Sequence, residues 1–363
     1  VPDLTAKAAR TAASNAGAKV VKTFAYEISG SEQQEIYDIN PDLVLLCGGT
    51  DGGNKEVIIA NAKHLVAIDR PFTTIVAGNK SANDDIKAIF NEAGKDVVIT
   101  ENVMPQFNKL NIEPARDAIR QLFISRIIEA KGLNILQAMT PYKIIPTPLA
   151  VLHACELLSK GTKTQQGRGD LWAVDIGGAT TDVYSMASGE PTVDNTMLKG
   201  LPEPWMKRTV EGDLGMRYSL THVYEQIPGS DNPENEYMQQ VKAWVELCTA
   251  HPDTLADPGS EEEKLEEFLG RSAVSMAVER HCGRIADVYT PLGLMHTQEG
   301  KDLMNVPSVI GIGGVLRNSR RPEEILKGSL YDFMHPECTK PRKPKFYLDQ
   351  KYIFASMGLL RSI

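Results

Sequence analysis

The chain has 363 residues, of which 24% are charged and 42% are hydrophobic, and this composition is typical of a soluble globular protein with two domains. Its formal charge is −8, so it has no excess of basic residues, which argues against a nucleic-acid partner. No apolar stretch is long enough to cross a bilayer. The five cysteines form no Cys-x-x-Cys pair, which predicts reduced thiols in a cytoplasmic protein.

The first part of the chain predicts an α/β domain with a parallel sheet. Strands are expected over residues 19–28, 43–46, 74–77 and 97–99, and helices over residues 4–16, 55–65, 84–93, 114–131 and 148–158. Alternation of strands and helices is typical of parallel strands joined by crossover helices. A polar, glycine-rich connection follows at 160–169. We place the domain boundary there, with a first α/β domain over 1–165 and a second domain over 166–363.

The second part of the chain predicts a β-meander followed by a mainly helical excursion. The expected strands cover 171–175, 182–186, 192–197, 306–312 and 345–348, the excursion covers about 216–288, and a last helix ends at Arg361. Ser260 and Glu263 have the spacing of a capping box, which predicts that an amphipathic helix begins there.

The most informative motif joins the first two strands of the meander. It begins at Asp175, ends at Asp182 and contains Gly177, Gly178, Ala179, Thr180 and Thr181. Two glycines can take a positive φ and bring backbone N–H groups against an anion, while a carboxylate at a strand end can hold Mg²⁺ through retained water. The alternative is a tight turn in a buried sheet. We favour a phosphate-binding hairpin because this order of residue types is hard to reach by chance, with Asp175 and Asp182 as candidate catalytic carboxylates and Asp175 on the metal side.

A second glycine turn lies much later in the chain, again at the end of an apolar run. It contains Gly311, Gly313 and Gly314, with Arg317 shortly after them. It is not the dinucleotide-binding fingerprint, because Leu316 stands where that pattern needs glycine. Such glycines either approach a ligand or let the following helix pack closely. Together with the hairpin, the turn points to a bound nucleotide.

Two further glycine-rich segments can each be interpreted in two ways. Residues 48–54 follow a strand, but Asn54 stands where a Walker P-loop needs lysine, so they form either a structural turn or a loop that faces a ligand or partner. Residues 211–215, with Gly212 and Asp213, either cap the helix that follows or approach the sugar of a nucleotide. The few histidines predict no metal site, and no Ser-His-Asp order stands out.

With these motifs in this order, the second half of the chain resembles the actin/Hsp70/sugar-kinase (ASKHA) ATPase superfamily. There, Asp-x-Gly-Gly-x-Thr-x-Asp is the second phosphate loop and the late Gly-Gly turn is the adenosine loop. The resemblance implies a two-lobed, actin-like ATPase fold of the ribonuclease H-like type with ATP and Mg²⁺ as cofactors. The residues that it assigns to the nucleotide are Gly177, Gly178, Ala179, Thr180, Thr181, Gly212, Asp213, Gly311, Gly313, Gly314 and Arg317.

The whole chain is more closely similar to the methylaspartate (glutamate) mutase accessory proteins of the GlmL or MutL type. The similar segments are residues 45–54, 173–182 and 208–217. This resemblance implies an ATP-dependent, chaperone-like reactivating factor for an adenosylcobalamin-dependent mutase of the glutamate mutase or aminomutase type. The mutase subunits would then be its partners.

One feature of the superfamily has no counterpart in the sequence. Its first phosphate loop, an Asp-x-Gly-x-Thr hairpin near the N-terminus, is not found before residue 171. We therefore expect the N-terminal hairpin to be missing and the first domain to be truncated, and a chain with one phosphate loop of two should bind ATP weakly or not at all. Two other functions stay open on the same fold, a small-molecule kinase and a non-enzymatic scaffold.

Overall fold

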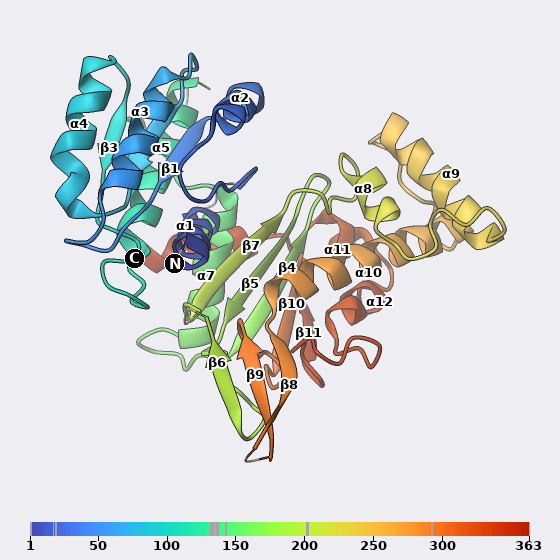
Figure 1. Cartoon of the computed structure of the whole chain (residues 1–363). Helices are drawn as coiled ribbons and strands as arrows, with labels where there is room; N and C mark the ends of the chain where they lie inside the picture. The colour runs from blue at the N-terminus through green and yellow to red at the C-terminus, as the bar shows by residue number, and fades with distance from the viewer. Residues whose placement is uncertain are drawn as a thin grey trace. The chain divides into compact units, whose positions relative to one another are not determined.

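The computed structural model describes residues 2–16, 18, 20–130, 135, 138–141, 144–200, 203–291 and 293–362 (Figure 1). The chain divides into two compact units, Val1–Pro146 and Thr147–Ile363. Both contain helices and sheets, so the expected α/β class is confirmed. Among the described residues, no helix combines the length and the apolar character that a membrane span requires.

The first unit is built on a parallel sheet of three strands in the order β1-β2-β3. Its strands and helices are β1 (Leu43–Leu46), β2 (Thr73–Val76), β3 (Val97–Ile99), α1 (Pro2–Ala16), α2 (Gly30–Ile39), α3 (Glu56–Ala67), η1 (Lys80–Ala82), α4 (Asn83–Glu92) and α5 (Glu113–Ala130). One buried cluster joins Ile58 and Phe90 of α3 and α4 to the sheet, and another joins Ile119 of α5 to Ile75. Apolar side chains thus cover the sheet from two sides, as alternating strands and helices predict.

The strand predicted over 19–28 is wrong, because the described residues 20–28 form no strand. Their backbone groups bond to a side chain instead: Asn61 accepts from the N–H of Ile28 at 2.8 Å and donates to the carbonyl of Tyr26 at 2.9 Å. The helix α2, which the sequence analysis missed, then begins at Ser29, where Ser29 and Glu32 form a complete capping box.

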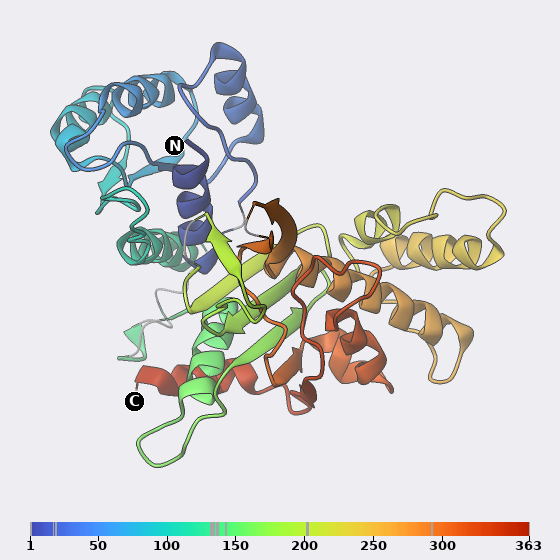
Figure 2. The ribbon, with the colours of Figure 1, turned by 60° about the horizontal axis from the view of Figure 1, so that its bottom comes forward.

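The second unit is built on a five-stranded sheet in the order β11-β10-β4-β5-β7. Its strands are β4 (Leu171–Ile176), β5 (Thr181–Met186), β7 (Met206–Glu211), β10 (Ser308–Ile312) and β11 (Lys345–Leu348). β10 pairs in parallel with β11 and with β4, and β5 pairs antiparallel with β4 and with β7. The helix α10 (Glu261–His281) belongs to the main apolar core with Trp172 and Val174 of β4, while α7 (Thr147–Lys160) packs against β4 and β5, with α13 (Phe354–Gly358) beside it (Figure 2).

The two units divide between Pro146 and Thr147, earlier than the glycine-rich connection at 160–169 where we expected the boundary. The reason is α7, which buries Leu149, Leu152 and Cys155 within the second unit. The connection itself lies inside that unit, where the hydroxyl of Ser159 donates to the carbonyl of Gly169 at 2.6 Å.

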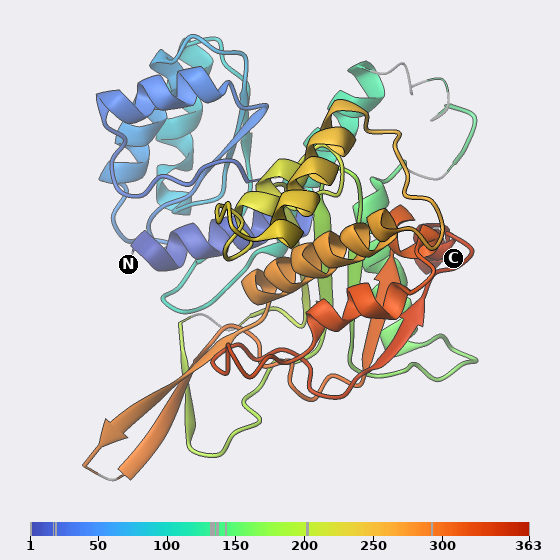
Figure 3. The ribbon, with the colours of Figure 1, turned by 90° about the vertical axis from the view of Figure 1, so that its right-hand side faces the viewer.

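The third strand of the meander lies later than predicted. β7 pairs with β5, whereas the predicted strand at 192–197 overlaps β6 (Thr196–Lys199). β6 belongs to a separate sheet with β9 (Gly293–Glu299) and β8 (Arg284–Thr290), in the order β6-β9-β8. The hairpin of β8 and β9 extends away from the five-stranded sheet (Figure 3). β8 also corrects the predicted helix over 284–288, because α10 ends at His281 and its C-cap, Cys282, has an extended backbone.

The helical excursion is otherwise confirmed. It contains α8 (Leu220–Glu225), α9 (Glu236–Ala250) and α10, and the elements after β10 are α11 (Gly314–Asn318), α12 (Pro322–Leu326) and η2 (Lys327–Ser329), with η3 (Leu359–Ser362) after α13. Ser260 caps α10 as predicted, since its hydroxyl accepts from the N–H of Glu263 at 3.2 Å. The carboxylate of Glu263 accepts from Gly259 rather than from Ser260, so the second half of the capping box is displaced by one residue.

Candidate functional site

The predicted phosphate hairpin is a tight connection between β4 and β5. The N–H of Gly177 donates to the carbonyl of Thr180 at 2.9 Å, and Asp175 lies directly opposite Asp182 in the antiparallel register. Both carboxylates therefore stand at the same end of the two strands. Asp182 is buried and Asp175 is partly buried, so the pair lies at the edge of the core.

The glycines of the hairpin do not act through a positive φ, which corrects that part of the prediction, because neither Gly177 nor Gly178 has one. Their carbonyls are bound instead: Gly177 accepts from the N–H of Met216 at 3.0 Å, and Gly178 accepts from Arg217 at 2.8 Å and from Tyr218 at 2.9 Å. Within the described part of the chain, no residue accepts a hydrogen bond from the N–H groups at 178–180. The hairpin is thus held by its carbonyls, while its N–H groups at 178–180 have no acceptor among the described residues.

The late glycine turn lies against this hairpin. Ile312 of β10 is the register partner of Asp175, and Gly313, with φ of 103°, follows immediately. A Cβ at Gly313 would collide with the carbonyl oxygen of Ile176 and stand 2.8 Å from Oδ1 of Asp175. Only glycine fits there. The structure therefore brings together two motifs that lie far apart in the sequence.

The other residues predicted for this turn have different surroundings. Gly314 is the first residue of α11, and the guanidinium of Arg317 lies 5.8 Å from the ring of Tyr352. Gly311 is buried inside β10, and Leu316 and Leu326 fill the space where its side chain would be. Gly311 therefore serves helix packing, which was the alternative interpretation.

The side chains around the hairpin include more carboxylates than basic groups. Asp182 accepts from Nη2 of Arg208 at 2.8 Å in a buried ion pair, yet burial still raises the pKa of Asp182. Burial also raises the pKa of Asp175 to about 7, and the neighbouring carboxylates Asp182 and Asp349 add to the increase while Arg208 opposes it. A buried carboxyl with an excess of negative neighbours favours a cation, which would lower its pKa again.

The two threonines of the hairpin have different roles. Thr180 hydrogen-bonds the carboxylate of Asp182 and is partly buried. Thr181 is completely buried and donates its hydroxyl to the carbonyl of Leu214 at 2.5 Å. Thr181 therefore holds the segment 211–215 rather than reaching outward.

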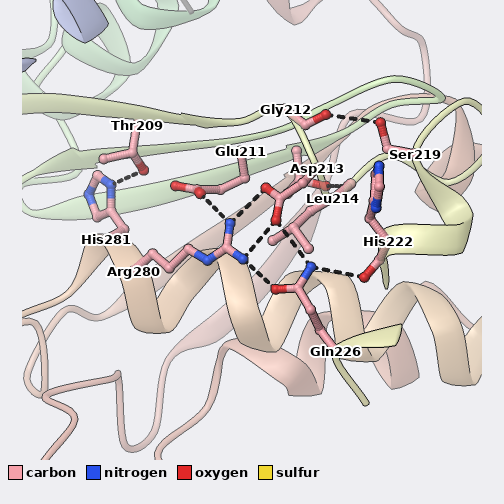
Figure 4. A network of polar contacts seen from close by, with 11 residues as sticks. Thr209, Glu211, Gly212, Asp213, Leu214, Ser219, His222, Gln226, Arg280 and His281 are labelled. Atoms are coloured by element: carbon pink, nitrogen blue, oxygen red, sulfur yellow. Dashed lines mark hydrogen bonds and ion pairs between the residues drawn. The ribbon is translucent and has the colours of Figure 1, made fainter. Parts of the chain in front are cut away.

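The segment 211–215 lies beside the hairpin, and its two carboxylates belong to a polar network with Arg280 (Figure 4). Arg280 binds Asp213 through two hydrogen bonds of 2.7 and 2.9 Å, and it also binds Glu211 at 2.8 Å. The bond from Arg280 is the main reason that the pKa of Asp213 falls to about 2. The segment does not cap α8, whose N-cap is Ser219, and Ser219 instead donates to the carbonyl of Gly212 at 2.9 Å.

Three charged residues near the hairpin were missed as site residues. Arg208, Arg280 and Asp349 come from β7, α10 and the end of β11. Arg208 lies within one of the segments that carry the family resemblance, so the sequence contained a signal that could have identified it. Asp349 follows a strand end, like Asp175, but nothing in the local sequence of Arg280 distinguishes it from an exposed arginine on a helix.

A serine and a histidine do meet elsewhere in this unit, although their order predicts no catalytic arrangement. Nε2 of His281 lies 2.8 Å from the hydroxyl of Ser185, and Nζ of Lys301 lies 3.2 Å from the same hydroxyl. All three side chains are wholly buried, and burial lowers the pKa of Lys301 to about 7. They form a sealed polar contact between β5 and α10. The described residues contain no cluster of three His, Cys, Asp or Glu side chains that could hold a metal by itself.

The glycine-rich loop 48–54 of the first unit is held by two buried asparagines. The side chain of Asn79 accepts from the N–H of Gly52 at 3.1 Å and donates to the carbonyls of Gly53 and Asn54. Asn102 donates to the carbonyl of Gly49 at 2.9 Å. These contacts give the loop a structural role within the first unit.

The fold and the site define an α/β protein whose second unit carries a glycine hairpin, an adjoining glycine turn and paired carboxylates. Residues 1–363 match the family described as MutL protein. Protein MutL of Clostridium tetanomorphum is 46% identical over 363 residues, a match that covers 99% of this chain and 78% of that protein. The chain therefore belongs to the MutL protein family.

Proposed function

We propose that the second unit binds ATP with Mg²⁺ at the 177–180 hairpin, in the manner of an actin-like ATPase. The observation that carries this proposal is the contact of Gly313 with Asp175 and Ile176, which joins the late glycine turn to the hairpin. One turn would serve the phosphates and the other the adenosine, with Arg317 beside the base. Donors at 178–180 that no described residue occupies suit the phosphate oxygens.

The residues around Asp175 fit a magnesium ion. Mg²⁺ usually keeps several waters and is held by one or two carboxylates together with substrate phosphates, so it needs no cage of protein ligands. Asp175 would hold the ion through water, while Asp182 is already paired with Arg208. When bound, the ion would neutralise charge on the transferred phosphoryl group. Asp175 would orient the water that the ion carries, and the hairpin N–H groups would stabilise the phosphates.

We propose further that this ATPase serves an adenosylcobalamin-dependent mutase of the glutamate mutase or aminomutase type as an accessory, reactivating factor. The support is membership of the MutL family together with the resemblance of residues 45–54, 173–182 and 208–217 to mutase accessory proteins. Nucleotide binding and release would then act as a switch in the contact with the mutase subunits.

Calorimetric titration of MgATP into the wild type and into Asp175→Ala tests the nucleotide site. We expect the substitution to raise the Kd at least about 100-fold, because it removes the carboxylate that holds the metal. Asp287→Ala is the matched control, since Asp287 is an exposed aspartate on β8 that pairs with His296 and should leave the Kd unchanged. Equal affinities of the wild type and Asp175→Ala would refute the assignment.

The same titration on a form extended at its N-terminus addresses the predicted first phosphate loop. Tighter binding by the extended form would support that expectation. The accessory role needs a separate assay, in which recovery of an inactivated cobalamin mutase is followed with ATP and with the Asp175→Ala protein. Full recovery with the variant would show that ATP at this site does not drive reactivation.

A further inference from the structure

The helix α10 holds the segment that supports the phosphate hairpin, and it does so at two points. Near its start, Glu266 accepts from Nη2 of Arg217 at 2.6 Å. At its end, Arg280 binds both Glu211 and Asp213. The two points are separated by 14 residues, which is about 21 Å along an α-helix. α10 therefore spans the whole length of the segment 211–217.

This segment is the support of the hairpin. The N–H groups of Met216 and Arg217 donate to the carbonyls of Gly177 and Gly178, and the hydroxyl of Ser219 shares its one proton between the carbonyls of Gly212 and Ala179, the latter at 3.0 Å. Gly215 lies so close to Ala179 that a Cβ would collide with the backbone of Ala179. A shift of the segment would therefore move the hairpin and its N–H groups.

Arg280 makes several hydrogen bonds to this segment and its surroundings, and their geometry depends on the shape of its guanidinium group. Its Nη1 bonds Glu211 and Asp213, and its Nη2 bonds the second oxygen of Asp213 and also Oε1 of Gln226. Gln226 in turn donates to Asp213 at 3.1 Å. Only the planar fork of an arginine can bind a carboxylate through two parallel bonds, so lysine would keep the charge and lose the orientation.

We propose that Arg280 is a positioning residue of the nucleotide site, which fixes the segment 211–217 behind the hairpin so that the donors at 178–180 are aligned for phosphate. The proposal rests on the nucleotide site proposed above. Arg280 acts through the segment and needs no contact with the nucleotide itself. The helical excursion is by this route coupled to the state of the phosphate hairpin.

The test compares MgATP affinity in the full chain carrying Arg280→Gln, Arg280→Lys or Arg284→Gln. We expect Arg280→Gln to raise the Kd about tenfold, because it removes charge-assisted hydrogen bonds that align the support, and Arg280→Lys to recover part of the loss. Arg284→Gln is the matched control, since Arg284 is an exposed arginine that pairs with Glu337 and lies just beyond the same helix. Asp213→Asn removes the charge of the other partner in the same ion pair, so it should raise the Kd about as much as Arg280→Gln.

Hydrogen exchange supplies a readout that a purely structural loss would not mimic. In Arg280→Gln the amides at 216–218 should exchange faster, while the core amides of β4 and β10 keep the protection that they have in the wild type. Global unfolding would change both groups. Wild-type affinity and wild-type exchange in both Arg280→Gln and Asp213→Asn would overturn the positioning role and leave the nucleotide site standing. Absence of nucleotide binding both in the wild type and in the form extended at its N-terminus would overturn the proposed function and this inference with it.

Discussion

Two glycine-rich loops follow strands of this protein, β1 and β4, and their backbone groups are bound in opposite ways. In the loop 48–54, after β1, the wholly buried side chain of Asn79 occupies donors and acceptors of the loop backbone. In the hairpin 177–180, after β4, partners bind the carbonyls from behind and the N–H groups at 178–180 have no acceptor among the described residues. A rigid loop with satisfied groups stabilises its unit, whereas one with aligned spare donors can also bind an anion.

The charges sharpen the difference. Asp51 of the first loop accepts hydrogen bonds from Lys80 N–H at 3.1 Å and from Asn102 at 3.0 Å. Asp175 beside the hairpin has carboxylate neighbours instead, and its pKa is raised to about 7. Asp51 connects parts of its loop, whereas the burial and the negative neighbours of Asp175 oppose its ionisation. Glycine content alone therefore does not separate a structural loop from a binding loop.

The largest effect is expected for Gly313→Ala. A Cβ there would collide with the Ile176 carbonyl, and the φ of 103° adds strain, so we expect a loss of about 3 kcal/mol in the free energy of unfolding and weak nucleotide binding. Gly314→Ala is the matched control for stability, because its nearest atom would be Nδ2 of Asn318 at 4.0 Å. Urea unfolding compares the two variants, and MgATP titration measures Gly313→Ala against the wild type. Equal behaviour of the two variants would contradict the close contact of the turn with β4.

Asn79→Ala should separate the two loops. It leaves the N–H of Gly52 and the carbonyl of Gly53 without their partner, so we expect the free energy of unfolding to fall by about 2 kcal/mol. The MgATP affinity of the protein should stay at the wild-type value. Asn91→Ala, at an exposed position on α4, serves as the control in the same urea experiment. A loss of nucleotide affinity in Asn79→Ala would mean that the loop 48–54 also serves the ligand.

The pH dependence of MgATP binding should follow Asp175. Its carboxyl is ionised above a pKa of about 7 and protonated below it, so the Kd should rise about tenfold from pH 8 to pH 6 as the cation loses its partner. Calorimetry on Asp175→Asn gives the contribution of the nucleotide alone. A ratio between variant and wild-type Kd that stays constant over this range would contradict the raised pKa.

The smallest effect concerns stability. Because the pKa of Asp175 is higher in the folded state than its usual value of 3.8, the folded protein holds the proton more tightly, and stability falls as the pH rises from about 4 through about 7. A shift of this size would cost the folded state at most about 4 kcal/mol at pH 8. Because Asp175 is only partly buried, solvent screens most of this cost, so Asp175→Asn should raise the free energy of unfolding by about 1 kcal/mol. The gain should fade below pH 4, where both states are protonated. Urea unfolding at several pH values measures it, and an equal gain at pH 4 and pH 8 would point to a cause other than ionisation.

Much of the secondary structure follows from the sequence because its signals are local. The alternation over residues 43–99 predicts β1 to β3 and the helices between them, and the apolar runs on either side of the hairpin predict β4 and β5. The errors arise where distant partners decide. Residues 20–28 alternate like a strand but bond to Asn61, and the strand at β6 pairs with β9, about 100 residues away.

The sequence by itself determined the α/β class, the family resemblance and the two glycine motifs, because each depends on residue types at short spacing. The tertiary structure decided what those motifs touch. Only the parallel pairing of β4 with β10 brings Gly313 onto Asp175, and only the packing of α10 brings Arg280 to Asp213. Both contacts join segments far apart in the chain, so their geometry depends on how the sheet and helices pack and has no local signature.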